Sequence, residues 1–246
     1  MAPYLFGGVQ AAESHGVDDR ARLRVLTFNM HGESADQNAF RQMIEREDPD
    51  LILLAEAPHD TNHLMRDWDS RYPYRISSDQ GLPLDIVMIS RWKVTSWSAD
   101  RSAAQFRSVL TAHLCHPSKQ KQCFTLVGLH AAQPFGEDVR RQRTQIDIAT
   151  RQVRAASTGA VVLMGDLNLT PWSSAFRSLI DGAQLSDTAK LRKLTATWSS
   201  RSPLFGLPID HILINGGFRV LGNRVGEDLG SDHFPVIADL ILASDP

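Results

Sequence analysis

Polar residues that could bind a metal ion or a phosphate recur at the ends of short apolar stretches in this sequence. The clearest case is residues 161–172 (VVLMGDLNLTPW), in which four apolar residues and a glycine precede Asp166 and Asn168. The apolar run is typical of a buried strand. Two oxygen-bearing side chains separated by one apolar residue can face the same way where such a strand ends. This pair suits a hard divalent cation or a phosphate held beside it.

Five further segments place polar residues at one end of a predicted strand. LRVLTFN ends at Asn29, DLILLAE at Glu56 and FTLVGLH at His130, PIDHILI has Asp210 and His211 near its start, and SDHFPVIADL has Ser231, Asp232 and His233 before its apolar run. A layered sheet could bring all of these strand ends to one rim. The sequence therefore predicts a metal and phosphate site assembled from six segments.

The composition is that of a globular chain without a strong charge bias. The 246 residues are 42% hydrophobic, and the formal net charge is -2. No stretch approaches the ~18 unbroken apolar residues of a membrane span. The near-neutral charge argues against a protein that coats DNA, but not against an enzyme that must release its product.

The chain is expected to form one large domain. Residues 1–22 lack the long apolar core of a signal peptide and indicate a mobile leader to the first strand. Residues 23–246 contain no repeat, low-complexity tract or linker that would justify a second domain.

The two cysteines flank a polar turn. Cys115 and Cys123 enclose HPSKQKQ, with the strand-like segments RSVLTAHL before the turn and FTLVGLH after it. Cysteines at matching ends of one hairpin can lie close enough for a disulfide, which would indicate an oxidising compartment. The alternative is two ordinary, partly buried thiols in a cytosolic protein. We favour the disulfide because both residues occupy matching ends of the hairpin.

Helical spacing of apolar residues predicts helices over residues 36–47, 61–68, 137–157 and 173–180. In the first of these, Phe40, Met43 and Ile44 form the apolar face. Residues 187–202 are mostly polar and ambiguous, and Trp198 is their one large apolar anchor.

The ordered motifs FNMHG, AE, GLH, GDLN, PIDH and SDHFPV resemble those of the endonuclease/exonuclease/phosphatase superfamily. The resemblance covers roughly residues 23–240 and is strongest to a bacterial subgroup of uncharacterised members, many of which carry membrane segments upstream. It implies an α/β fold, a four-layer α/β/β/α sandwich of two mixed sheets with helices outside, and a metal site at the rim of the strand ends.

The same resemblance implies a role for each matching oxygen-bearing side chain. Glu56 would be the main ligand of Mg²⁺ or Mn²⁺, with Asn29 and Asp232 beside it. Asp166 and Asn168 would hold or activate the water nucleophile and orient the phosphate. These roles agree with the chemistry of phosphodiester hydrolysis, which needs charge neutralised on the non-bridging oxygens and a deprotonated water in line.

The histidines and one arginine take further roles by resemblance. His233 would contact the scissile phosphate, and Asp210 would fix its tautomer and support its positive form. His130 matches the second histidine of the DNase-like branch, and Asp85 is a candidate partner for it. Arg107 resembles a family arginine that reaches phosphate, and an ordinary surface arginine is an equally good interpretation.

These observations lead to three hypotheses about function. The first is a Mg²⁺- or Mn²⁺-dependent phosphodiesterase, acting as a nuclease on DNA with little sequence preference. The second is a phosphatase or lipid phosphodiesterase that acts on a small or membrane-borne phosphoester. The third is a binding module with a degenerate site, and the intact set of acidic residues and histidines speaks against it. We expect a monomer in the cell envelope or secreted, in view of the expected disulfide and of the family's upstream membrane segments.

Overall fold

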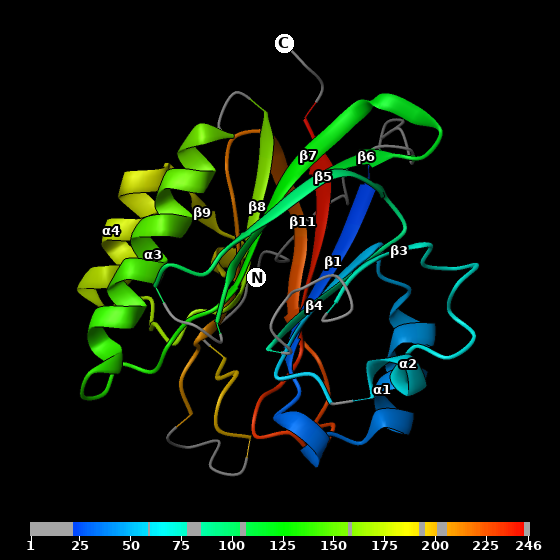
Figure 1. The fold of residues 1–246 in the computed structure, drawn as a ribbon, viewed down its shortest axis with the longest axis horizontal. Coiled ribbons are helices and arrows are strands. Elements are labelled where there is room, and N and C mark those ends of the chain that lie inside the picture. Colours follow the sequence, from blue (N-terminus) through cyan, green and yellow to red (C-terminus); the bar gives the residue numbers. More distant parts are fainter. Residues whose placement is uncertain are drawn as a thin grey trace, which may run out of the picture.

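The computed structural model describes residues 22–58, 60–77, 85–103, 107–156, 159–191, 195–200 and 206–243. Apart from Arg22, which begins the first strand, the expected leader of residues 1–22 lies outside them. The described chain folds into two six-stranded sheets, which lie face to face with helices on their outer sides (Figure 1). No helix in these ranges is long and apolar enough to cross a membrane.

Each sheet has one parallel pair of strands near its middle and antiparallel neighbours around it. The first sheet has the order β11 (Phe218–Val225), β12 (Val236–Leu242), β1 (Arg22–Asn29), β2 (Leu51–Ala55), β4 (Ile86–Ser90) and β3 (Tyr74–Ile76). The second has the order β5 (Lys93–Asp100), β6 (Val109–His116), β7 (Lys119–His130), β8 (Ala160–Asp166), β10 (Asp210–Ile214) and β9 (Ser186–Asp187). The parallel pairs are β1 with β2 and β7 with β8, so both sheets are mixed, as predicted.

The helices cover the outer faces. Figure 1 shows α3 (Asp138–Ala155) and α4 (Ser174–Ala183) beside the second sheet, and α1 (Gln37–Glu47) and α2 (Thr61–Leu64) beside the first. Two short 3₁₀ turns cover Gly32–Ser34 and Thr188–Leu191. Asp36 caps α1 by accepting hydrogen bonds from the backbone N–H groups of Asn38 and Ala39, so the helix begins one residue later than predicted.

Two other helices differ in length from the sequence prediction. The helix expected over residues 61–68 ends at Leu64, and Asp67, inside the expected range, adopts a left-handed conformation (φ 68°) that an α-helix does not accommodate. The helix expected over residues 173–180 continues to Ala183, with Ser173 as its N-cap. The longest helix is α3, as predicted, although residue 157 lies outside the described part.

Three apolar clusters separate the four layers. The cluster between the sheets includes Leu53, Leu110, Phe124, Met164 and Leu240. A second cluster joins the first sheet to α1 and α2, and a third joins the second sheet to α3 and α4. The expected four-layer α/β/β/α sandwich is therefore confirmed.

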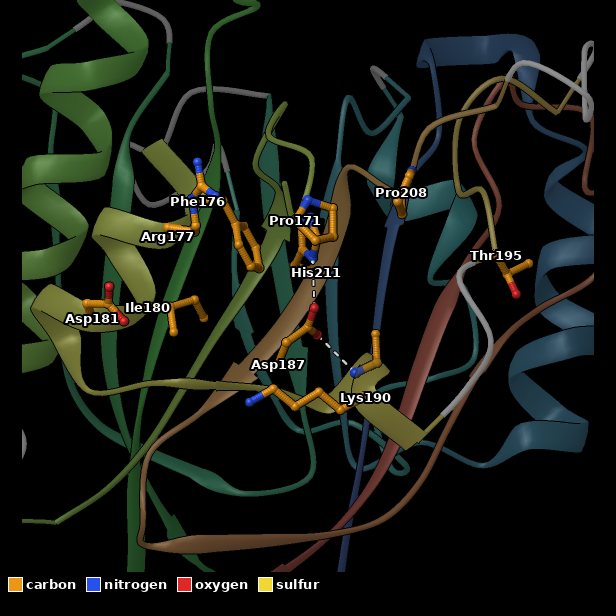
Figure 2. A pocket seen from close by; sticks show the side chains of 11 residues that line it. Pro171, Phe176, Arg177, Ile180, Asp181, Asp187, Lys190, Thr195, Pro208 and His211 are labelled. Carbon is orange, nitrogen blue, oxygen red and sulfur yellow. Dashed lines mark hydrogen bonds and ion pairs between the residues drawn. The ribbon is translucent and has the colours of Figure 1, made fainter. Parts of the chain in front are cut away.

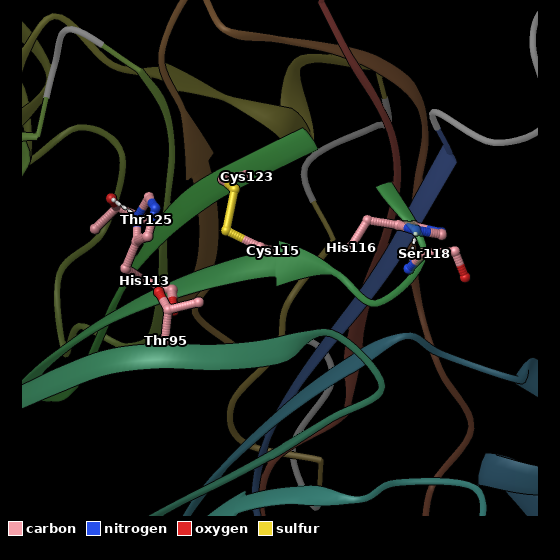
Figure 3. The surroundings of a disulfide bond; sticks show 7 residues. All are labelled: Thr95, His113, Cys115, His116, Ser118, Cys123 and Thr125. Carbon is pink, nitrogen blue, oxygen red and sulfur yellow. Dashed lines mark hydrogen bonds between the residues drawn. A yellow bond between two sulfur atoms is a disulfide. The ribbon is translucent and has the colours of Figure 1, made fainter. Parts of the chain in front are cut away.

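Cys115 and Cys123 form a disulfide across the β6–β7 hairpin (Figure 3). The two residues are register partners on adjacent strands, which explains why the pairing could be predicted from their positions in the sequence. The bond closes a loop with a sequence separation of 8 residues, and chain-entropy arguments give a stabilisation of about 2–3 kcal/mol for a loop of this size. Cys123 lies near the start of β7 and His130 at its end, so the disulfide fastens the hairpin away from the polar strand ends.

Candidate active site

The two parallel strand pairs place polar residues at neighbouring strand ends. Asn29 ends β1, opposite Ala55 of β2, and Glu56 follows directly. His130 and Asp166 end β7 and β8 as register partners, and Asp210 begins β10 opposite Asp166. The predicted meeting of strand ends at one rim is confirmed for these residues, because side-chain contacts connect them across both sheets.

Asn29 connects the two sheets. Its Nδ2 lies 3.1 Å from Asp166 Oδ2 on the second sheet and 3.3 Å from Glu56 Oε1 on the first. Its Oδ1 accepts a hydrogen bond of 3.0 Å from the backbone N–H of His31, which fixes the orientation of the amide. Asn29 therefore holds two carboxylates near one another by donating to both.

His130 lies between the same two carboxylates. Its Nε2 is 3.4 Å from Glu56 Oε1 and 3.7 Å from Asp166 Oδ2, and its side chain is buried. Burial lowers the pKa of His130 well below its ordinary value, and the positive charges of Arg107 and His233 act in the same direction. His130 is therefore a neutral imidazole at physiological pH.

The expected partnership between Asp85 and His130 is not seen. His130 Nδ1 and both carboxylate oxygens of Asp85 are buried without a hydrogen-bond partner in the described structure. Burial raises the pKa of Asp85 to about 7, against the charge of Arg107. Arg107 donates a hydrogen bond of 2.7 Å to the carbonyl oxygen of Ala131, which places it beside the site but not in the lining of the cavity. Asp85 is tied to Glu56 through its backbone carbonyl oxygen, and its carboxylate forms no hydrogen bond with His130.

His233 pairs with Asp210 as predicted, with 2.9 Å between Nδ1 and Oδ2. Burial lowers the pKa of His233, but the charge and hydrogen bond of Asp210, together with the charges of Asp166 and Asp232, raise it to about 9. The imidazole is therefore positively charged at neutral pH. The backbone N–H of Asp210 donates to Thr197 Oγ1 at 3.1 Å, which holds the start of β10 in place.

Replacement of Asp210 with asparagine should lower the pKa of His233. The asparagine side chain has nearly the same shape as that of Asp210 but lacks the negative charge that stabilises the protonated imidazole. The folded pKa of about 9 lies above the ordinary 6.5, so this group's stabilisation is complete below pH 6.5 and is lost as the pH rises through 9. We expect this pH dependence to shrink in the variant, and any hydrolysis to fall about 10²-fold. An NMR titration of His233 measures the first effect, and Asp187→Asn, beside His211, is the matched control. An unchanged titration of His233 in Asp210→Asn would contradict the assignment.

Asp166 is buried at the end of β8, with His233 as its charged neighbour. Burial raises its pKa to about 7, with a further contribution from Asp210, against His233, the backbone N–H of Asn168 and the side chain of Asn29. Asn168 donates through Nδ2 to the carbonyl oxygen of Ala131 at 2.9 Å, and its Nδ2 lies 3.4 Å from Asp166 Oδ2. The GDLN turn thus keeps both residues at the site.

Asp232 is held by two residues that sequence reasoning did not assign to the site. One carboxylate oxygen lies 3.0 Å from His31 Nδ1, and the other accepts a hydrogen bond of 3.0 Å from the indole N–H of Trp198. His31 belongs to the FNMHG motif, and that position was the available signal for it. Trp198 is 34 residues away from Asp232 in the sequence, and its spacing carries no such signal.

Three residues at the site have left-handed backbone conformations without being glycine. They are His31 (φ 51°), Glu56 (φ 45°) and Asn168 (φ 48°). Such conformations cost free energy for L-residues and concentrate at functional sites, where the surrounding structure enforces them. For Glu56, this turn directly follows β2, and the side chain reaches Asn29 and His130.

A cavity of about 390 Å³ opens over these strand ends. Its polar lining consists of Asn29, His31, Glu56, His130, Gln133, Asp166, Asn168, Thr170, Ser173, Asp232 and His233. Asp210 supports His233 from behind this lining. Within the described ranges, neither lysine nor arginine lines the cavity.

The donor set fits a hard divalent cation. Glu56, Asp166 and Asp232 supply carboxylate oxygens to one cavity, and Asn29 adds an amide. The carboxylate of Asp166 is buried with the charge of His233 as its cationic neighbour, so a bound Mg²⁺ or Mn²⁺ would compensate negative charge that these residues leave in excess. Suitable ligand atoms of Asp166, Asp210 and His233 lie within 4.8 Å of one another. His233 in its charged form cannot bind a metal, which leaves the oxygens as the available ligands.

A second cavity of about 410 Å³ lies beside the first (Figure 2). Residues of the segments 169–173 and 207–211 line both cavities, so these segments separate them. His211 lines the second cavity and donates through Nε2 to the carbonyl oxygen of Leu169 at 2.8 Å. This histidine therefore supports the chain just after Asn168.

The family model described as "Endonuclease/Exonuclease/phosphatase family" matches residues 26–233. The chain belongs to this family, and the predicted resemblance is confirmed.

Solved structures show the same fold at low sequence identity. An endonuclease/exonuclease/phosphatase from Bacteroides vulgatus has a TM-score of 0.77 at 18% identity, with 90% of this chain and 99% of that chain covered. TDP2 from D. rerio, humanized by 14 mutations, has a TM-score of 0.72 at 15% identity, with 89% and 99% covered. A mannosyl-6-phosphatase from Bacteroides thetaiotaomicron has a TM-score of 0.69 at 16% identity, with 89% and 100% covered. No curated protein matches the sequence.

Proposed function

We propose that this protein is a divalent-metal-dependent phosphodiesterase. The observation that carries the proposal is the continuous set of contacts from Glu56 through Asn29 and His130 to Asp166, and on to His233 and Asp210. It joins Asn29 and Glu56, at strand ends of the first sheet, to Asp166 and Asp210 of the second sheet, and it includes the charged His233 just before β12. Family membership supports phosphoester chemistry in general.

The side chains divide the work of hydrolysis between them. A bound Mg²⁺ or Mn²⁺ would neutralise the non-bridging oxygens of the phosphate. Asp166, with its raised pKa, is suited to accept a proton from water when ionised, and the amide of Asn29 keeps it in position. His233 brings a positive charge to the phosphate, and Asp210 stabilises that charge. His130, neutral and buried, can donate or accept a hydrogen bond without adding charge.

Two substrate classes are in competition. Sequence reasoning favours DNA, cut with little sequence preference. The cavity favours the second class, a small or membrane-borne phosphoester, because its described lining offers no lysine or arginine for the phosphates that flank a scissile bond in DNA. Two of the structural neighbours are named TDP2 and a mannosyl-6-phosphatase. The shared fold therefore does not decide between the two substrate classes.

The deciding experiment compares hydrolysis of supercoiled plasmid with hydrolysis of bis(p-nitrophenyl) phosphate by the same purified protein. Each is measured with Mg²⁺, with Mn²⁺ and with EDTA, and Asp166→Ala serves as the control for contaminating enzymes. Metal-dependent nicking that the variant lacks would establish a nuclease. Metal-dependent release of p-nitrophenol without nicking would assign the second class. Absence of both activities in folded protein would contradict the proposal.

We expect Glu56 to account for most of the stabilisation of the folded protein by metal ions. We expect Mg²⁺ or Mn²⁺ to raise the Tm of the wild-type protein, since a ligand present at 100 times its Kd stabilises the folded state by about 2.7 kcal/mol. In Glu56→Ala this increase should be largely lost. Thermal unfolding with and without each metal measures it, and Glu45→Ala, on the exposed side of α1, is the matched control. An equal rise of Tm in Glu56→Ala and wild type would refute Glu56 as the main ligand.

We also propose an oxidising location, the cell envelope or the exterior, because the Cys115–Cys123 disulfide would be reduced in most cytosols. Alkylation of thiols in intact cells, before lysis, tests this directly. Two protected cysteines support the proposal, and two alkylated cysteines contradict it.

A further inference from the structure

Phe135 is an exposed aromatic residue at the mouth of the candidate active site. Its side chain lines the cavity although 74% of its surface is accessible. Hydrogen bonds hold its backbone on both sides, from the N–H of Phe135 to Gln133 and from the N–H of Asp138 to Phe135. A phenyl ring at the entrance of a polar site leaves apolar area in water that a bound molecule can cover.

The rest of the lining continues this apolar character. Besides the polar residues given above, the cavity is lined by Pro134, Phe135, Leu169, Trp198, Leu207 and Ile209. Trp172 is 55% exposed on the loop whose residues Thr170 and Ser173 also line the cavity. The catalytic groups thus share their cavity with an apolar wall contributed by three loops.

The charges in the cavity limit what a substrate can carry. Glu56, Asp166 and Asp232 are acidic, and His233 is the cation held among them. One divalent metal ion and His233 supply three positive charges, which the carboxylates of Glu56, Asp166 and Asp232 already match, so every negative charge of a substrate is added in excess. Arg107 stands outside this lining with its guanidinium group on the carbonyl oxygen of Ala131, and the described lining itself has no lysine or arginine, so a second phosphate inside the cavity would face carboxylates.

We propose that the substrate is a phosphodiester with one negative charge and an apolar organic group, and that Phe135 binds this group at the cavity mouth. The proposal rests on the proposed phosphodiesterase function and narrows it. Burial of an aromatic or alkyl group against Phe135 and the apolar wall contributes binding free energy that a methyl ester cannot supply. A soluble aryl or alkyl diester and a phospholipid share this chemistry.

The test measures binding, so that it does not depend on turnover. Diphenyl phosphate and dimethyl phosphate carry the same single charge and differ in their apolar area. Calorimetry with protein in saturating Mg²⁺ should show diphenyl phosphate binding about tenfold more tightly. Phe135→Ala should lose most of this preference and bind dimethyl phosphate as before. Trp97→Ala is the matched control, because Trp97 is also exposed but lines a separate surface cavity.

Equal binding of the two diesters by the wild type, or an undiminished preference in Phe135→Ala, would overturn the proposal. The protein could show a preference for diphenyl phosphate that Phe135→Ala loses, and yet hydrolyse neither plasmid nor the p-nitrophenyl ester. This outcome would support the apolar subsite at Phe135 and contradict the proposed phosphodiesterase activity. Vesicles of sphingomyelin or phosphatidylcholine identify the source of the group. Binding to vesicles that Phe135→Ala loses supports a lipid diester, whereas the diphenyl preference without vesicle binding supports a soluble one.

Discussion

Replacement of Asp166 with alanine should reduce kcat for phosphodiester hydrolysis by at least about 10³-fold. Asp166 is the residue at which the contacts of the site meet, because Asn29, His130, Asn168 and His233 all approach its carboxylate. Its removal takes away a proton acceptor and the negative charge toward which the other groups are oriented. Steady-state kinetics with a p-nitrophenyl diester measure the loss, and Asp181→Ala, on the exposed side of α4, is the control. Wild-type turnover in Asp166→Ala would remove this residue from the mechanism.

The same variant has a signature in stability that is independent of turnover. The folded pKa of Asp166, about 7, lies above its ordinary 3.8. In EDTA, its contribution to the free energy of unfolding is therefore complete below pH 3.8 and is lost as the pH rises through 7. Asp85 has a similarly raised pKa and acts in the same direction, so Asp166→Ala should reduce this fall without abolishing it. Urea denaturation between about pH 4.5 and about pH 8, which covers most of this transition, measures the difference.

Gly165→Ala should prevent stable folding. Gly165 has φ 140°, and a Cβ atom there would lie 1.9 Å from the carbonyl oxygen of Leu129. The backbone cannot move aside, because Leu129 and Gly165 are register partners in the parallel β7–β8 pair inside the second sheet. We expect this backbone strain, together with the clash, to lower the free energy of unfolding by more than about 4 kcal/mol.

Gly216→Ala provides the comparison for this effect. Nothing lies within 4 Å of a Cβ atom at Gly216, so we expect its free energy of unfolding to stay within about 0.5 kcal/mol of the wild type. Soluble yield and urea denaturation of both variants give the measurement. If the free energy of unfolding of Gly165→Ala lies within about 1 kcal/mol of the wild-type value, β8 does not approach β7 as closely as described.

The sequence allowed the strand ends to be predicted because burial and polarity change abruptly there. Buried strands such as β2 and β8 read as continuous apolar runs, so the first polar residue after each run, Glu56 or Asp166, marks a rim. The pairing of His233 with Asp210 and the disulfide were also within reach, since each follows from recognisable motifs or matching hairpin positions.

Other parts of the site depend on tertiary contacts that local patterns do not encode. Trp198 contacts Asp232 from a segment whose composition predicts no clear structure. Phe135 belongs to the site only because the fold places it in the lining of the cavity. The left-handed turn at Glu56 runs against residue preference, which favours glycine or asparagine there. These features result from packing that overrides local propensity, so one sequence read alone did not indicate them.

The strand order also bears on how the protein is made. β12 is the last strand in the chain, yet it lies inside the first sheet between β11 and β1. During synthesis, β1 has no antiparallel partner on that side until β12 leaves the ribosome, and His233 arrives only a few residues earlier. A nascent or prematurely terminated chain therefore lacks both a complete sheet and a complete site. Under the proposed function, hydrolysis should therefore appear only once translation has passed β12.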